Sequence, residues 1–169
     1  MSIFILHAPI RSGKTTALYD RICKMNSVGG ILAIDGEGGL RYLYTISDRS
    51  KHRFQITQEI GYSISIGRFH FLKSTFITAC KECVDSYYHL QNRFTIIDEF
   101  GPLEMNGEGL MPTIGSLIVD AYSSRDKLVV IVMRNKIVGD FMTKFNFNKE
   151  KVKLIDFVAQ PDFSLDENQ

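Results

Sequence analysis

The chain of 169 residues has no tryptophan, only three cysteines and four prolines, and almost no excess of either charge. So few thiols exclude a small scaffold held together by disulfide bonds, and we expect them to be reduced. Twenty basic residues against nineteen acidic ones give a net charge of +1, which supplies no strong field to recruit nucleic acid or a membrane surface. The longest unbroken aliphatic stretch, Leu128 to Met133, is far shorter than the roughly 20 residues that span a bilayer.

The rest of the composition indicates an ordinary globular protein. Hydrophobic residues make up 44% of the chain, and a chain of this length buries about two-thirds of its unfolded surface. The N-terminus has no basic and then apolar leader, so a signal peptide is not expected. We predict one domain over residues 1–161, followed by a polar and frayed tail over residues 162–169.

The most informative motif follows an apolar strand at residues 3–6. It reads Ala8-Pro9-Ile10-Arg11-Ser12-Gly13-Lys14-Thr15-Thr16, which is a phosphate-binding loop with alanine at its first position. The backbone N–H groups of such a loop surround triphosphate oxygens, and Gly13 has no Cβ to block that approach. Lys14 would supply charge to the β- and γ-phosphates, and the Thr15 hydroxyl is placed to hold Mg²⁺. The following helix points its positive dipole end at the same phosphates.

A second motif is the apolar strand at residues 94–97, which ends in Asp98-Glu99. Proteins with a phosphate-binding loop place an Mg²⁺-orienting aspartate at such a position, often followed by a glutamate that activates water. Glu99 is thus a candidate general base, although it could also only bridge to a neighbouring helix. The two motifs together predict a protein that handles nucleoside triphosphates.

Strands and helices alternate along most of the chain. Helices are predicted over residues 14–25, 73–90 and 138–145 and within 108–124. Strands are predicted over residues 3–6, 31–34, 40–46, 54–56, 63–66, 69–71, 94–99, 127–133 and 152–157. Gly29-Gly30 is expected to separate the first helix from the next strand. This order predicts an α/β fold in three layers, with a largely parallel sheet that the segment 31–71 extends with antiparallel strands. Ligands of such sheets bind at the carboxyl ends of the strands, where Ala8 and Asp98 both fall.

With both motifs in hand, the chain resembles the P-loop nucleoside-triphosphatase family first described from thermophiles, whose vertebrate member is called cancer-related nucleoside-triphosphatase. The residues that carry the resemblance are 12–18, the turn region 30–46 with Gly38-Gly39, and Ile96-Ile97-Asp98-Glu99-Phe100-Gly101-Pro102-Leu103-Glu104. It covers nearly the whole chain. The resemblance implies a fold akin to the RecA and AAA group and a slow, rather unselective hydrolysis of nucleoside triphosphates.

The loop departs from this family at two positions. The family typically has glycine where this chain has Arg11, and often proline where Ile10 stands. Arg11 could reach the γ-phosphate or point to solvent. Arg134 follows the buried strand at residues 127–133 and should emerge at the same sheet edge as Asp98, where a guanidinium could stabilise the γ-phosphate. A solvated arginine at the end of a strand is an equally good interpretation of Arg134.

Three further patterns have a structural alternative. Glu104 is either part of the site or a cap, and we weigh these evenly. Cys80-Lys81-Glu82-Cys83 suggests a metal site, but zinc usually needs a second pair of ligands, so we interpret both thiols as packing residues of a helix. The basic segment from Arg49 to Arg53 is expected to be a solvated loop between two strands.

Three functions from different classes remain open on the sequence. The leading one is Mg²⁺-dependent hydrolysis of nucleoside triphosphates in the cytoplasm, with Lys14, Glu99, Arg134 and Arg11 as catalytic candidates. The second is a small-molecule or nucleotide kinase, against which stand the water-activating Glu99 and the lack of a recognisable arginine-rich lid. The third is a nucleotide-gated module that regulates a partner protein. The motifs name no preferred nucleobase and no oligomeric state.

Overall fold

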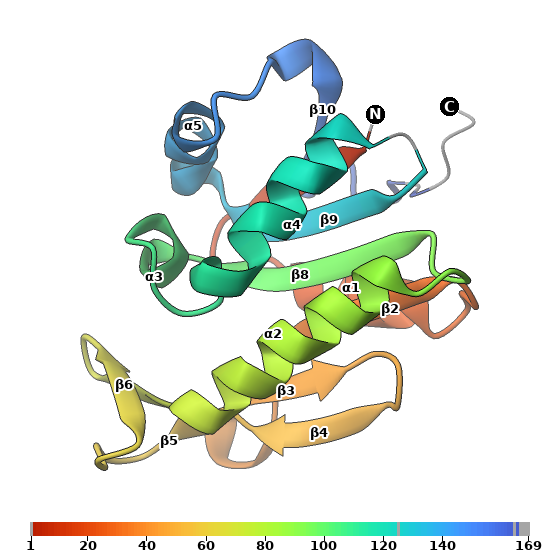
Figure 1. The fold of residues 1–169 in the computed structure, drawn as a ribbon. Coiled ribbons are helices and arrows are strands. Elements are labelled where there is room, and N and C mark those ends of the chain that lie inside the picture. Colours follow the sequence, from red (N-terminus) through yellow and green to blue (C-terminus); the bar gives the residue numbers. More distant parts are fainter. Residues whose placement is uncertain (1, 125, 164, 166–169) are drawn as a thin grey trace.

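The computed structural model describes residues 2–124, 126–163 and 165. Its main sheet is built from β1 (Ile3–Ala8), β2 (Val28–Asp35), β3 (Arg41–Thr45), β4 (Ser50–Arg53), β8 (Phe94–Phe100), β9 (Leu128–Arg134) and β10 (Val152–Asp156). These seven strands lie in the order β10-β1-β9-β8-β2-β3-β4 (Figure 1). The strands from β10 to β2 run parallel, and β3 and β4 add antiparallel pairs at one edge.

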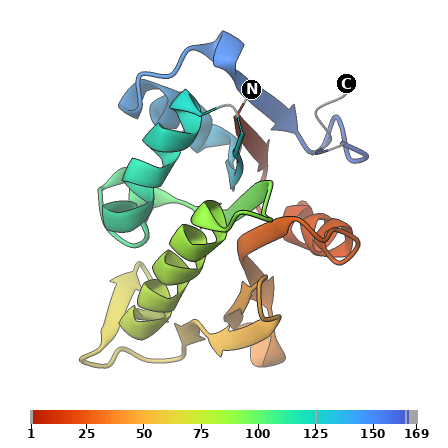
Figure 2. The same cartoon turned by 45° about the vertical axis from the view of Figure 1, so that its right-hand side comes forward.

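Helices cover both faces of this sheet, which is why its central strands are continuous apolar runs. All side chains from Ile3 to Leu6 and from Leu128 to Met133 are buried. The helix α1 (Lys14–Ile22) packs on one face, whereas α2 (Lys73–Tyr88), α4 (Met111–Ser123) and α5 (Asn135–Lys144) pack on the other (Figure 2). The short α3 (Pro102–Met105) follows β8, and 3-10 turns lie at Glu37–Gly39 and Lys149–Lys151. The predicted three-layer fold with a largely parallel sheet is therefore confirmed.

The middle of the chain departs from the predicted arrangement. The strands β5 (Gln55–Ile56), β6 (Ser63–Ile66) and β7 (Phe69–Leu72) do not extend the main sheet, but form a separate three-stranded sheet in the order β5-β7-β6. The chain leaves the main sheet at Phe54, whose ring packs against Phe71 and Phe76 at 4.9 Å. Phe54, the residue directly after β4, therefore packs against the second sheet at the point where the pairing with β3 ends.

The basic segment from Arg49 to Arg53 is also not the loop that was predicted. Residues Ser50–Arg53 form the edge strand β4, paired with β3. The side chains of Lys51 and Arg53 are exposed. Charged side chains on an edge strand oppose pairing with another chain, so the charges suit this position.

Gly29 and Gly30 lie inside β2, and the helix before them ends earlier than predicted, at Ile22. The two glycines lie within β2 because the backbones of β2 and β8 approach each other closely there. A Cβ on Gly30 would lie 2.1 Å from the carbonyl oxygen of Ile96 on β8, and Gly30 also has a φ of +104°. The glycines therefore permit tight packing of β2 rather than a turn.

The C-terminal segment closes the α1 face of the core. Phe163 and Leu165 are 7% and 5% exposed and pack with the apolar side of α1. The guanidinium of Arg21 lies 4.2 Å from the centre of the Phe163 ring and donates to the Pro161 carbonyl at 2.8 Å. The tail predicted from residue 162 thus contains two core residues, because this segment covers apolar surface of the helix. Residues 164 and 166–169 of that tail lie outside the described part.

None of the helices in the described ranges is long and apolar enough to cross a membrane.

Candidate functional site

The site residues predicted from the sequence meet at the carboxyl edge of the sheet. Ala8, the last residue of β1, pairs in register with Arg134 at the end of β9, and β8 with Asp98 lies beside β9. The Thr15 hydroxyl at the start of α1 donates a hydrogen bond to Asp98 Oδ2 at 2.8 Å. This bond joins the two sequence motifs, whose residues are 83 positions apart.

The loop between β1 and α1 has two residues in the left-handed conformation. Gly13, the residue directly before α1, has a φ of +86°, and Arg11 has a φ of +59°. Glycine is the residue that adopts this conformation without strain, whereas other residues pay about 1–2 kcal/mol for it. A glycine at the position of Arg11 would adopt this backbone conformation without strain.

The space in front of Gly13 is open. A Cβ built on this residue would meet no other described atom within 4 Å. The N–H groups in the first turn of α1, directly after Gly13, have no helical partner. The geometry fits an anion held by the loop backbone.

Lys14 turns its ammonium group to the inside of the loop. Its Nζ donates to the carbonyl of Pro9 at 3.0 Å and lies 3.4 Å from the carbonyl of Ala8 and 3.3 Å from Ser12 Oγ. Burial lowers the pKa of Lys14, while the charges of Asp98 and Glu99 oppose that fall. A partly desolvated ammonium group is well placed to bind phosphate oxygens.

Asp98 is 3% exposed and uses both oxygens in hydrogen bonds. Its Oδ2 accepts from Thr15 and from the backbone N–H of Ala33 at 3.1 Å, and its Oδ1 accepts from the Glu99 N–H at 2.9 Å. Burial and then the neighbouring charge of Glu99 raise the pKa of the Asp98 carboxyl, against the effect of these hydrogen bonds. A buried carboxylate of this kind is stabilised by a cation.

The strand β8 is irregular at Glu99. The register between β8 and β9 shifts between Ile97 and Phe100, and Glu99 has a φ of +69°. Such a bulge redirects a side chain, and bulges are frequent next to active sites. The Glu99 side chain remains 39% exposed, and its Oε1 lies 3.0 Å from Arg41 Nη1.

Arg41 is a residue of this edge that the sequence analysis missed. It begins β3, and its guanidinium contacts Glu99, the carbonyl of Ala33 at 2.8 Å and Asp35 Oδ1 at 3.3 Å. Opposite charges that face each other across a hairpin often pair. Only the contact with Asp35 had a signal in the sequence, because the turn region with Gly38-Gly39 brings Asp35 and Arg41 into register across the hairpin.

The two arginines predicted from the sequence lie at the same edge in different settings. Arg134 is half-buried at the end of β9, and its charge is a smaller contribution to the lowered pKa of Lys14. Arg11 is exposed. The loop residues Pro9, Ile10 and Thr16 are also exposed, so they can contribute backbone atoms to a ligand.

Glu104 holds backbone groups that follow β8. It is 3% exposed and accepts the backbone N–H groups of Gly101 at 2.9 Å and of Leu110 at 3.1 Å. Burial raises its pKa, and the two hydrogen bonds oppose the rise. These contacts favour the interpretation of Glu104 as a cap that closes the segment from β8 to α4.

The two cysteines of α2 occupy packed positions. Cys83 is fully buried, which raises the pKa of its thiol, and Cys80 Sγ lies 3.7 Å from the carbonyl oxygen of Leu110. In the described part of the chain, no three His, Cys, Asp or Glu side chains gather into a group that could hold a metal by themselves.

The residues at the loop nevertheless fit Mg²⁺ together with phosphate. Mg²⁺ takes only oxygen ligands and is commonly held by one or two side chains plus substrate phosphates. Thr15 and Asp98 supply a hydroxyl and a carboxylate oxygen 2.8 Å apart, directly beside the loop. These two residues would hold the ion.

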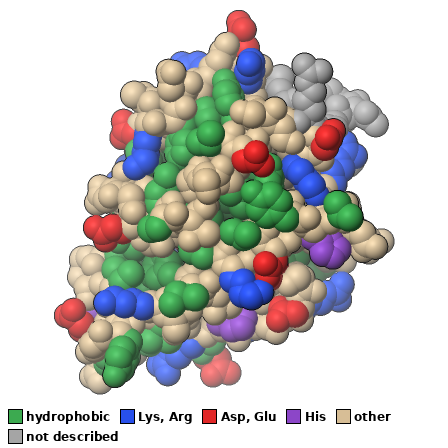
Figure 3. Space-filling model, in the orientation of Figure 1, with side chains coloured by type: hydrophobic (Ala, Val, Ile, Leu, Met, Phe, Trp, Pro, Cys, Tyr) green, Lys and Arg blue, Asp and Glu red, His purple; other side chains and the backbone are tan. Residues whose placement is uncertain are grey.

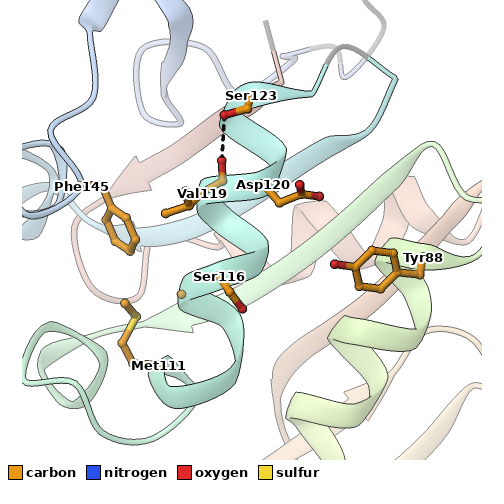
Figure 4. A pocket seen from close by; sticks show the side chains of 8 residues that line it. Tyr88, Met111, Ser116, Val119, Asp120, Ser123 and Phe145 are labelled. Atoms are coloured by element: carbon orange, nitrogen blue, oxygen red, sulfur yellow. Dashed lines mark hydrogen bonds between the residues drawn. The ribbon is translucent and has the colours of Figure 1, made fainter.

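A shallow groove of about 730 Å³ is lined by residues of α4, by Tyr88 of α2 and by Phe145, on a face where hydrophobic side chains gather (Figure 3). Figure 4 shows Tyr88, at the end of α2, and Phe145, just after α5, on two sides of α4. None of the candidate site residues lines this groove.

Comparison of the chain with known proteins identifies a similar fold. No family model and no curated protein matches the chain. Its fold is similar to the crystal structure of THEP1 from the hyperthermophile Aquifex aeolicus, with a TM-score of 0.65 and 16% sequence identity over 92% of this chain and 89% of the other. The chain therefore shares the fold of THEP1, a three-layer α/β fold with a mostly parallel sheet.

Proposed function

We propose that this protein is an Mg²⁺-dependent nucleoside triphosphatase that releases diphosphate and phosphate, slowly and with broad nucleotide specificity. We also propose that it is a distant member of the thermophile-derived family that the sequence resembles. The observation that carries the proposal is the 2.8 Å hydrogen bond between Thr15 and Asp98, which unites the phosphate-binding loop and the acidic strand end in one site. The similarity to THEP1 supports it at the level of the fold.

Each residue of the site has a role in this proposal. The loop backbone from Ala8 to Thr16 binds the phosphate oxygens, and Lys14 contacts the terminal phosphates. Thr15 and Asp98 hold Mg²⁺, which neutralises charge on the phosphates when it is bound. Glu99 accepts a proton from the attacking water.

Two other functions compete with hydrolysis. A kinase would bind its nucleotide in the same way, but the half-exposed Glu99 beside the loop suits activation of water better than transfer to an acceptor. A nucleotide-gated module that regulates a partner protein would use the same site as a timer. We retain both as alternatives that the assay below separates.

The proposal is tested by phosphate release from a panel of purine and pyrimidine triphosphates, with Mg²⁺ and with EDTA in its place. We expect release that requires Mg²⁺ and varies little with the base. The same assay with candidate acceptors present identifies a kinase, because the phosphate would appear on the acceptor. Tight binding with no release from any nucleotide would contradict hydrolysis and favour the gated module.

Arg134→Ala should slow turnover with little change in nucleotide affinity. A cation beside Lys14 can stabilise charge that develops on the γ-phosphate, and arginines in this role contribute about 10³–10⁵ in rate. Arg11→Gly should have a smaller effect, mostly on binding, because glycine adopts the left-handed backbone of this position and preserves the loop. Steady-state turnover and binding of a non-hydrolysable nucleotide measure both effects.

Arg134→Lys is the matched control for the first variant, because it keeps the charge and loses the planar fork. Normal turnover of Arg134→Ala with an inactive Arg11→Gly would reverse the two roles. If both variants behave as wild type, neither arginine acts in the reaction.

A further inference from the structure

The Glu99 carboxylate is held by one side chain. Its backbone lies in an irregular, left-handed part of β8, and the side chain is 39% exposed, so the strand alone does not fix the carboxylate. Among the residues that the structure describes, Arg41 is the one whose side chain pairs with it, at 3.0 Å. The position of the proposed base thus depends on the position of Arg41.

Arg41 itself is fixed from several sides. Its Nη1 donates to the Ala33 carbonyl at 2.8 Å, and its Nε lies 3.3 Å from Asp35 Oδ1. Its backbone carbonyl accepts the N–H of Phe54 at 3.2 Å, where the second sheet begins. The Arg41 side chain is 32% exposed, and its guanidinium contacts oxygens of Ala33, Asp35 and Glu99, so several contacts together set its direction.

Ala33 connects this support to the other carboxylate of the site. Its N–H donates to Asp98 Oδ2 at 3.1 Å, and its carbonyl accepts from Arg41 at 2.8 Å. The proposed metal ligand and the proposed base are therefore both positioned against the same residue of β2. A change in the direction of Arg41 would alter the distance between the two acidic groups.

We propose that Arg41 is a positioning residue, which fixes the Glu99 carboxylate relative to Asp98 so that the base faces the attacking water. This inference rests on the proposed hydrolysis. Arg41 acts through Glu99 and does not bind the nucleotide. A reacting group that is misplaced by about 1 Å can cost about 10²-fold in rate, so loss of this support should be measured in turnover.

The test compares Arg41→Ala and Arg41→Lys with wild type in turnover and in binding of a non-hydrolysable triphosphate. Arg53→Ala, an exposed arginine on the neighbouring strand β4, is the matched control. We expect Arg41→Ala to lower kcat about 10- to 100-fold, with nucleotide affinity within about threefold of wild type. Arg41→Lys should restore part of the rate, because it keeps one donor to Glu99. Circular dichroism checks that each variant is folded, and Arg41→Lys serves if Arg41→Ala is not.

The decisive comparison places Arg41→Ala in a Glu99→Gln background. The residual rate of each variant is measured in single turnovers with enzyme in excess. If Arg41 works through Glu99, this residual rate is no slower in the double variant than in Glu99→Gln alone. A further loss of rate in the double variant would show that Arg41 acts in another way than through Glu99 and would overturn the inference. Unchanged or faster turnover of folded Arg41→Ala would also overturn it.

The proposed function and this inference fail in different ways. Absence of hydrolysis by the wild-type protein removes both. Hydrolysis by wild type that persists in Arg41→Ala removes only the role of Arg41.

Discussion

Lys14→Ala is expected to lower nucleotide affinity about 10- to 100-fold or more and to reduce turnover to background while the protein remains folded. A hydrogen bond to a charged group is worth about 1.5–3 kcal/mol, and Lys14 would make such bonds to two phosphates. Its contacts in the structure are oxygens of its own loop, at Ala8, Pro9 and Ser12. The core does not depend on these contacts, so the fold should be retained.

The measurement is binding of a fluorescent nucleotide beside phosphate release and thermal unfolding. Lys24→Ala is the matched control, since this lysine is exposed just beyond the other end of α1. Normal phosphate release by folded Lys14→Ala would refute the assignment of the loop.

Glu99→Gln is expected to bind nucleotide and Mg²⁺ as wild type does but to lose hydrolysis. The amide preserves the shape of the side chain and removes the base, and general-base catalysis contributes about 10²–10⁴ in rate. Asp98 keeps the backbone N–H of residue 99 as a partner, because the substitution changes only the side chain. Single-turnover hydrolysis, measured beside equilibrium binding, separates the two effects.

Glu108→Gln provides the control for this change, because Glu108 is an exposed glutamate outside the site. Hydrolysis at the wild-type rate by Glu99→Gln would mean that another group, or the substrate itself, accepts the proton. Loss of nucleotide binding in this variant would instead show that Glu99 supports the site structurally.

The strand, loop and helix over residues 3–22 and the position of Asp98 near the end of a strand could be predicted from the sequence, because local patterns determine both. A strand, a turn with glycine and a helix must follow one another for the loop to form, and these are adjacent in the chain. The meeting of Thr15 and Asp98 followed from topology, since the carboxyl ends of parallel strands share one edge of the sheet. The structure places these two side chains in contact.

Features that depend on contacts between distant segments were not predictable. The left-handed backbone at Glu99 follows from a register shift between two strands, and nothing in the order of residues 94–100 signals it. The separate sheet β5-β7-β6 depends on where Phe54 packs. Phe163 and Leu165 were assigned to a polar tail because burial of two apolar residues requires knowledge of the surface they cover.

Within the candidate site, Arg41 is the clearest example of a residue that could not be predicted from the sequence. Its sequence context is an ordinary turn followed by a strand, which indicates a surface charge. Only the strand order, which places β3 next to β2 and β2 next to β8, brings its guanidinium to Glu99. A residue that acts through another one has no motif of its own.

The central claim is that residues 8–16 and Asp98 form one site for Mg²⁺ and a nucleoside triphosphate. A crystal structure with Mg²⁺ and a non-hydrolysable triphosphate tests it most directly. The claim predicts the phosphates within the loop, the terminal phosphate at Lys14, and the metal ion beside Thr15 and Asp98. A nucleotide bound elsewhere on the molecule, with the loop and Asp98 free of phosphate and metal, would contradict it.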